Sequence, residues 1–195
     1  MKYSTSMAMY GWIYGTMVPD LGKDVRKKLR KEYKAILLRS GDIGQKNMLL
    51  GSYTLCAFFI AMNRANGLSA DENIEKMRKG MKSSKLLKIA LGDAKGYLDE
   101  KRMEGRYRWS EDTHKHTYPD DWVVDILPAQ GKYALGYDYL ECGCCKMCAH
   151  EGCPELAKYL CSLDYMLFDV MGMGLDRTQT LAEGGEKCDF RMYLK

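Results

Sequence analysis

Five of the eight cysteines in this 195-residue chain fall within ECGCCKMCAHEGCPEL, residues 141–156. Cys142, Cys145, Cys148 and Cys153 are spaced as Cys-x2-Cys-x2-Cys-x4-Cys-Pro. The iron–sulfur run of bacterial ferredoxins has the same form but is one residue shorter before its last cysteine. Cysteines two residues apart also bind zinc, with a distant cysteine or histidine completing the set. The spacing therefore predicts a candidate zinc or Fe–S site at these four cysteines.

A second group of reactive side chains follows in the last third of the chain. Cys161 and Asp164 are three residues apart, so a helix would place both on one face. Arg177 and the pair Cys188–Asp189 lie in two stretches that we predict to be paired strands, so they could meet across a sheet. A thiol, two carboxylates and a guanidinium in one place have the composition of an active site. The alternative is an ordinary sheet surface, with Arg177 salt-bridged to Asp189 and Cys188 buried.

These side chains have to be positioned by the rest of the chain, whose first half, residues 1–98, has the pattern of a helical layer. Apolar residues recur at helical spacing within Lys23–Arg39 and within Gln45–Arg64, the most apolar part of the sequence. Ser69 and Glu72 have the spacing of a capping box, which predicts the start of a third long helix.

The polar stretch 99–121 separates the two halves, and we expect it to be an irregular loop. A long loop within a compact domain often carries function. His114 and His116 fall in this stretch, and two histidines in a polar loop are more often exposed than metal-bound.

Residues 120–195 have the pattern of a sheet with one helix. The stretch WVVDILPAQGKYALGYDYLEC contains two β-rich runs around PAQGK, which is a hairpin signal. Pro154 suits the first turn of a following helix. LDRTQTLA and KCDFRMYL then read as two more strands joined through EGGE. We therefore predict an α+β fold in a single domain, residues 1–195: an N-terminal helical layer followed by a β-hairpin–helix–β-hairpin unit that forms an antiparallel sheet and carries the site.

The composition narrows the classes of function. With 46% hydrophobic and 29% charged residues, the chain can bury its own core without disulfides. The net charge of +4 comes mainly from residues 23–34, where helical spacing indicates a solvated helix face and not a nucleic-acid surface. We find no signal peptide and no apolar run that spans a bilayer. These features predict a cytoplasmic protein that binds neither nucleic acid nor membrane.

Four short motifs together resemble those of a known family. GCPEL at residues 152–156, Cys161 with Asp164, RTQT at 177–180 and GGEKCDFR at 184–191 have the order and spacing of the L-2-amino-thiazoline-4-carboxylic acid hydrolase family. The family pattern also has a cysteine ten residues before the glycine of the first motif, which corresponds to Cys142. Three cysteines thus match the family, whereas the remaining cysteines of the 141–156 stretch are additions; these additions are Cys144, Cys145, Cys148 and Cys153. The sequence DVMGMGLD replaces the Asn-Pro turn of many members, which bears on the substrate more than on the fold.

The resemblance implies hydrolysis of a small cyclic isothiourea or amidine that carries a carboxylate, on a route to cysteine. Arg177 and Thr178 would then hold the carboxylate, and Asp164 or Asp189 would hold or deprotonate the amidine nitrogens. We favour Cys188 as the nucleophile that attacks the central carbon, with the two other family cysteines, Cys142 and Cys161, beside it. The alternative is a zinc ion on these three cysteines that supplies a hydroxide.

Two other classes of function remain open. The cysteine cluster could belong to a metal or Fe–S protein with a redox role. The same fold could also be a non-catalytic module that senses a small anionic molecule, because a family name does not transfer specificity. In each case we expect the ligand to be a small molecule.

Overall fold

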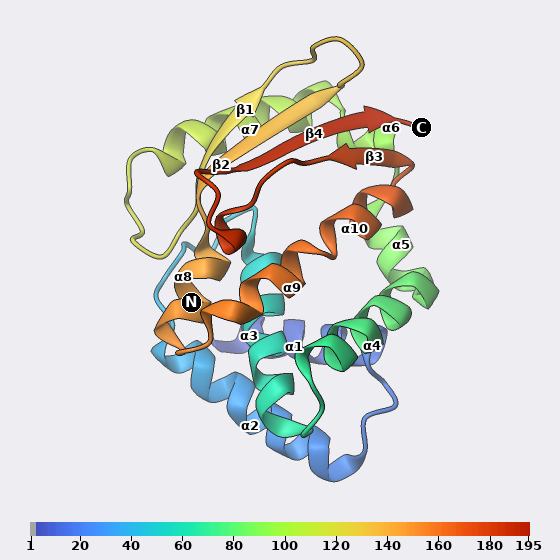
Figure 1. The fold of residues 1–195 in the computed structure, drawn as a ribbon, viewed down its shortest axis with the longest axis vertical. Coiled ribbons are helices and arrows are strands. Elements are labelled where there is room, and N and C mark those ends of the chain that lie inside the picture. Colours follow the sequence, from blue (N-terminus) through green and yellow to red (C-terminus); the bar gives the residue numbers. More distant parts are fainter. Residues whose placement is uncertain (1–2) are drawn as a thin grey trace.

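A four-stranded antiparallel sheet forms one side of the protein, and helices cover one of its faces (Figure 1). The computed structural model describes residues 3–195. The strands stand in the order β1-β2-β4-β3 and are β1 Val123–Leu127, β2 Leu135–Glu141, β3 Met173–Asp176 and β4 Cys188–Leu194. The predicted α+β class and the antiparallel sheet are confirmed.

The helices form two groups in the sequence. Those before the sheet are α1 Tyr3–Met17, α2 Lys23–Arg39, α3 Leu50–Ala65, α4 Ala70–Ser83, α5 Lys85–Leu91, α6 Ala94–Tyr97 and α7 Glu100–Thr113. Those between β2 and β4 are α8 Gly143–His150, α9 Ala157–Cys161, α10 Asp164–Val170 and the 3-10 turns η1 Pro154–Leu156 and η2 Leu181–Glu183. Among the described residues, no helix is long and apolar enough to cross a membrane.

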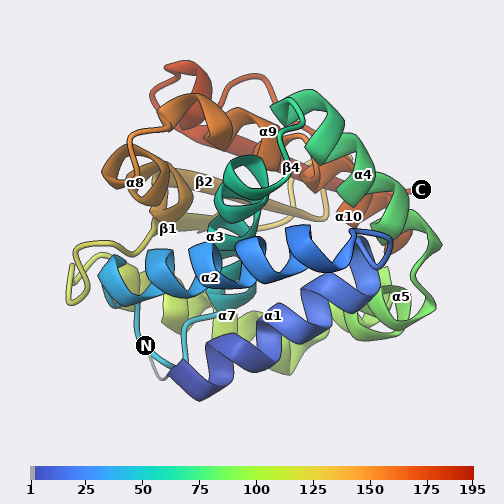
Figure 2. The same ribbon diagram turned by 90° about the horizontal axis from the view of Figure 1, so that it is seen from below.

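Helix α3 is the centre of the helical layer (Figure 2). Its residues from Tyr53 to Met62 are almost all buried, because α1, α2, α4 and α8 pack around it. The bounds predicted for α2 are confirmed, and α3 lies within the predicted range Gln45–Arg64. Ser69 and Glu72 form the predicted capping box at the start of α4, with Ser69 Oγ accepting from the Glu72 N–H and Glu72 accepting in return.

The stretch 99–121 was predicted to be an irregular loop, and that prediction is wrong for most of its length. Asp99 caps α7 by accepting a hydrogen bond of 3.2 Å from the N–H of Arg102. The buried residues of α7 are Ser110 and Thr113, which bond the backbone of Val124 in β1. The apolar residues Met103 and Trp109 pack on the sheet as well, but both stay partly exposed, so the sequence lacks the apolar stripe by which a packed helix is recognised. The two histidines after α7 are exposed, as expected.

In the second half, the β1–β2 hairpin is confirmed, but the next two segments differ from the prediction. The cysteine-rich stretch forms α8, to which the sequence pattern gave no structure. The single helix predicted after Pro154 is divided into η1, α9 and α10. Strand β3 ends at Asp176, so the residues from Arg177 to Thr180 lie in the connection to β4 and not on a strand.

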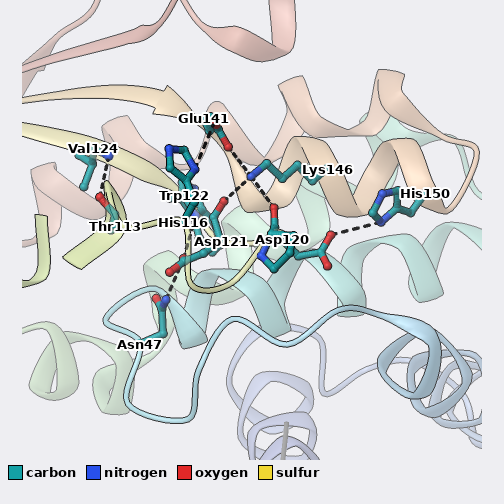
Figure 3. A network of polar contacts seen from close by, with 11 residues as sticks. Asn47, Thr113, His116, Asp120, Asp121, Trp122, Val124, Glu141, Lys146 and His150 are labelled. Atoms are coloured by element: carbon teal, nitrogen blue, oxygen red, sulfur yellow. Dashed lines mark hydrogen bonds and ion pairs between the residues drawn. The ribbon is translucent and has the colours of Figure 1, made fainter. Parts of the chain in front are cut away.

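Both ends of α8 are fixed by ionic contacts. At the first end, Lys146 Nζ donates to the carbonyls of Pro119 and Asp121, each at 2.7 Å, and to the carboxylate of Glu141 (Figure 3). At the other end, the carboxylate of Glu151 accepts hydrogen bonds from two arginines of the helical layer. Arg39 of α2 bonds both of its oxygens, at 2.7 and 2.6 Å, and Arg64 of α3 bonds one at 2.7 Å. Only 5% of the Glu151 side chain is exposed.

We predict that Glu151→Gln lowers the free energy of unfolding by about 1.5–3 kcal/mol, because it removes charge-assisted hydrogen bonds to two arginines. The matched control is Glu75→Gln, which removes a carboxylate that is 52% exposed and paired with Arg78 on one helix face. The control should cost less than about 1 kcal/mol, as is usual for exposed pairs. Urea unfolding followed by circular dichroism measures both, and equal losses would show that Glu151 does not anchor α8.

Candidate functional site

Cys142 lies at the point where β2 ends and α8 begins, and it is the N-cap residue of that helix. Its sulfur closes no regular capping hydrogen bond. The thiols of Cys144 and Cys145, and also their backbone N–H groups, nevertheless approach it closely enough to stabilise a thiolate. Together they outweigh the effect of burial and hold the pKa of Cys142 well below its ordinary value. These contacts favour the thiolate form of Cys142.

Gly143 allows the first turn of α8 to pack closely against residues 120–122, the segment before β1. A Cβ atom at this position would stand 2.7 Å from the carbonyl oxygen of Asp120 and 2.7 Å from the ring of Trp122. Neither neighbour can give way easily, because one is backbone and the other is a buried indole. A side chain at position 143 would push the first turn of α8, and Cys142 with it, away from β1.

Asp164 and Arg177 form a close ion pair beside this cysteine. Arg177 Nη1 donates to Asp164 Oδ2 at 2.9 Å, and Nη2 donates to the carbonyl oxygen of Cys161 at 3.1 Å. The guanidinium also lies 5.0 Å from the ring centres of Tyr165 and Phe190, and its side chain is 6% exposed. The partner that the sequence suggested for Arg177 was Asp189; this was wrong, because Arg177 follows β3 and turns towards the start of α10.

Burial raises the pKa of Asp164 to about 7, although the charge of Arg177 opposes the shift. The side chain is 28% exposed, so a small molecule can reach it. A carboxyl group with this pKa can give or take a proton at neutral pH, which an ordinary aspartate cannot do efficiently.

Asp189 organises the connection between β3 and β4. Its carboxylate accepts hydrogen bonds from the backbone N–H of Thr178 at 2.9 Å, the Thr178 hydroxyl at 2.6 Å and the backbone N–H of Gln179 at 2.9 Å. Burial acts to raise the pKa of Asp189, but these hydrogen bonds outweigh it and lower the pKa. Both donors of Thr178 are used by Asp189, so this pair holds the loop after Arg177 in place.

The two other family cysteines have protonated thiols. Burial raises the pKa of Cys188 to about 11, even though the backbone N–H of Leu181 donates to its sulfur at 3.2 Å. Burial, and then the charge of Asp164, raise the pKa of Cys161. Neither thiol is ionised at neutral pH.

Electrostatic interactions show that these groups share one neighbourhood. A negative charge on Cys142 raises the pKa of Asp164, Cys161 and Cys188. It also raises the pKa of Tyr139, a residue of β2 that lies opposite Cys188 in the sheet. The sequence analysis missed Tyr139. A signal was available, because Tyr137 and Tyr139 alternate along the strand that leads to Cys142 and so point to one face.

The four cysteines with ferredoxin-like spacing are not brought together. Cys148 is fully buried, and its sulfur lies 3.7 Å from that of Cys56 in α3. Cys153 lies beyond the C-terminal end of α8, near Arg64 and Glu155. Across residues 3–195, no group of three or more His, Cys, Asp or Glu side chains is arranged to hold a metal ion.

A cleft of about 640 Å³ lies away from this neighbourhood, between the loop 42–47, α7 and the residues that follow it. Its lining includes both apolar side chains, such as Trp109, and charged ones, such as Asp121. The carboxylate of Asp121 accepts a hydrogen bond from Asn47 (Figure 3). None of the site residues predicted from the sequence lines this cleft.

A known protein family matches most of the chain. The family model of the L-2-amino-thiazoline-4-carboxylic acid hydrolases matches residues 47–192, from the helical layer to the last strand. The chain belongs to this family. Curated proteins give no significant match, so the relationship is established at the level of the family. The matched range includes the whole Cys142 neighbourhood, and the resemblance inferred from the sequence motifs is confirmed.

We predict that Cys142 is the first thiol to react with iodoacetamide at pH 6–7, because only the thiolate is nucleophilic. Cys188 should react more slowly, since its pKa is about 11. Cys56 is the internal control: its pKa is lowered to about 6, mainly by the thiols of Cys144 and Cys148, but its side chain is fully buried. Mass spectrometry of peptides taken at short times ranks the three. Faster labelling of Cys188 would contradict this account of the site.

Proposed function

We propose that the protein hydrolyses a small cyclic amidine or isothiourea that carries a carboxylate, such as L-2-amino-thiazoline-4-carboxylate, and so feeds cysteine formation. The observation that carries this proposal is that Cys142, whose pKa is lowered, lies within electrostatic range of Asp164, whose pKa is about 7 and which is bonded by Arg177. A nucleophile and a proton donor ready at the same pH are what opening such a ring requires. We keep the prediction of a cytoplasmic location, where reducing conditions would preserve the thiolate.

We assign the nucleophile to Cys142 in place of Cys188, which the sequence favoured. Cys188 has a raised pKa and would have to lose a proton before it could attack. Cys142 needs no separate base. Cys161 and Cys188 then line the site as protonated thiols beside the nucleophile.

The reaction needs one proton donor that later becomes an acceptor. The Cys142 thiolate adds to the central carbon of the protonated amidine, and neutral Asp164 donates its proton to the ring nitrogen as the C–N bond breaks. Ionised Asp164 then takes a proton from a water molecule, whose oxygen attacks the same carbon. Cys142 leaves as a thiolate, the remaining hydroxyl proton passes to the released amine, and one water molecule has been consumed. A pKa near 7 suits both steps.

Arg177 has two roles in this proposal. Its contact with Asp164 positions that carboxyl group and limits the rise in its pKa. A guanidinium has five N–H donors, and the hydrogen bonds to Asp164 and Cys161 use two of them. The remaining N–H donors are suited to the carboxylate of a small anionic substrate.

We predict that Cys142→Ser lowers kcat by at least about a thousandfold, because a hydroxyl is a far weaker nucleophile at neutral pH. Cys188→Ser is the matched control and should keep most of the activity. Turnover of L-2-amino-thiazoline-4-carboxylate is followed by mass spectrometry as the addition of water, and a new amine or thiol identifies the ring bond that breaks. A large loss in Cys188→Ser with activity retained in Cys142→Ser would restore the original assignment. Absence of turnover in the unaltered protein would favour the sensor alternative.

We also predict that kcat/KM falls as the pH rises through about 7, because ionised Asp164 cannot donate a proton. Arg177→Gln should move this basic limb to higher pH, since the positive charge that lowers the pKa of Asp164 is removed. Arg177→Lys keeps the charge and should leave the limb nearly in place while reducing the rate. Identical profiles in all three proteins would exclude Asp164 as the titrating group.

A further inference from the structure

The additional cysteine Cys145 is placed to react with Cys142. They are the first and last residues of the sequence Cys-Gly-Cys-Cys at the start of α8, with Cys142 at the N-cap and Cys145 three residues later. Side chains three residues apart in a helix are neighbours, with Cβ atoms roughly 5–6 Å apart. Small rotations bring such a pair within the range of a disulfide. The two sulfurs lie close enough in the reduced protein for each thiol to shift the pKa of the other.

We propose that Cys142 and Cys145 are a redox-active dithiol, which small-molecule disulfides oxidise to an intramolecular disulfide. We also expect this oxidation to stop hydrolysis, and this expectation rests on the proposed role of Cys142 as nucleophile.

The environments of the two sulfurs fit the two steps of thiol–disulfide exchange. The Cys142 thiolate attacks one sulfur of a small disulfide RSSR, forms a mixed disulfide and releases one thiolate RS⁻. Cys145 then gives up its proton and attacks the Cys142 sulfur, which releases the second RS⁻. The protein dithiol loses two electrons, and RSSR is reduced to two thiols. Cys142 is poised to attack first, and Cys145 is held protonated until the mixed disulfide removes the negative charge beside it.

The other cysteines near Cys142 are less suited to be its partner. Cys144 also approaches Cys142, but its thiol donates to the carbonyl oxygen of Ser52 in α3 at 3.7 Å and is held there. A disulfide between Cys142 and Cys144 would also close a smaller ring over a bent backbone. Cys56 and Cys148 are close to each other, but both are fully buried, so a small disulfide cannot reach them.

The attachments of α8 keep the dithiol together. Lys146 follows Cys145 directly and is bonded to the segment before β1. The pair therefore does not depend on a moving loop, and oxidation can proceed without rearrangement of the helix. A low-pKa cysteine at a helix start with a second cysteine three residues later is the usual arrangement of redox-active dithiols.

The test uses the full chain, fully reduced and then exposed to hydroxyethyl disulfide at pH 7. Free thiols are alkylated, and the tryptic peptide 133–146, which contains only Cys142, Cys144 and Cys145, is analysed by mass spectrometry. We expect an internal disulfide with alkylated Cys144, reversed by dithiothreitol. Cys145→Ser should stop at the mixed disulfide on Cys142, whereas the matched control Cys144→Ser should still close the internal disulfide. A disulfide from Cys142 to Cys144, or no internal disulfide at all, would overturn the proposal.

Hydrolysis is measured on the same samples, so the two proposals can fail separately. Loss of turnover on oxidation and recovery with dithiothreitol would support both. A Cys142–Cys145 disulfide in a protein that still hydrolyses substrate would retain the dithiol and overturn Cys142 as nucleophile. Unimpaired hydrolysis in a protein that forms no such disulfide would overturn the dithiol alone.

Discussion

The close approach of the first turn of α8 to Trp122 is the constraint on which the site depends. Only a glycine fits at position 143, and this fixes the residue before it at the junction of β2 and α8. Cys142 therefore lies at the positive end of the helix, where the N–H groups of the first turn lower its pKa. Lys146 and Glu151 hold the two ends of the helix, so that the sulfur keeps its place relative to the sheet.

Within this frame, burial and polar contacts move two acidic groups in opposite directions. Cys142 is stabilised as an anion by neighbouring thiols and N–H groups, and its pKa falls. Burial raises the pKa of Asp164 by more than the charge of Arg177 lowers it, and the pKa rises to about 7. Pairs of groups whose environments separate their pKa values from the ordinary ones are the usual source of distinct acid and nucleophile roles in one site. The position of Arg177 matters most here. If its guanidinium bonded Asp189, no positive charge would limit the rise in the pKa of Asp164.

Much of the fold could be predicted from the sequence, because α2, α3 and the capping box of α4 depend on local patterns. Helix α7 could not, since its buried residues are Ser110 and Thr113, which carry no apolar signal. The site was predicted as a set of residues but not as a set of contacts. The expected pairing of Arg177 with Asp189 assumed a strand that continues past Asp176, whereas the chain leaves the sheet there and the guanidinium turns to α10.

The ferredoxin-like spacing shows why a motif and a ligand set are different things. Cys144 and Cys148 are one turn apart and face α3, whereas Cys142 and Cys145 meet at the start of α8, so the ferredoxin-like spacing combines residues from two separate contacts. Helix α8 packs on α3, and Cys148 fills that contact against Cys56 as a small apolar residue would. The spacing is thus explained by packing at one end of the helix. At its first turn, Cys142 and Cys145 are partly exposed, so small molecules can reach them, unlike Cys56 and Cys148.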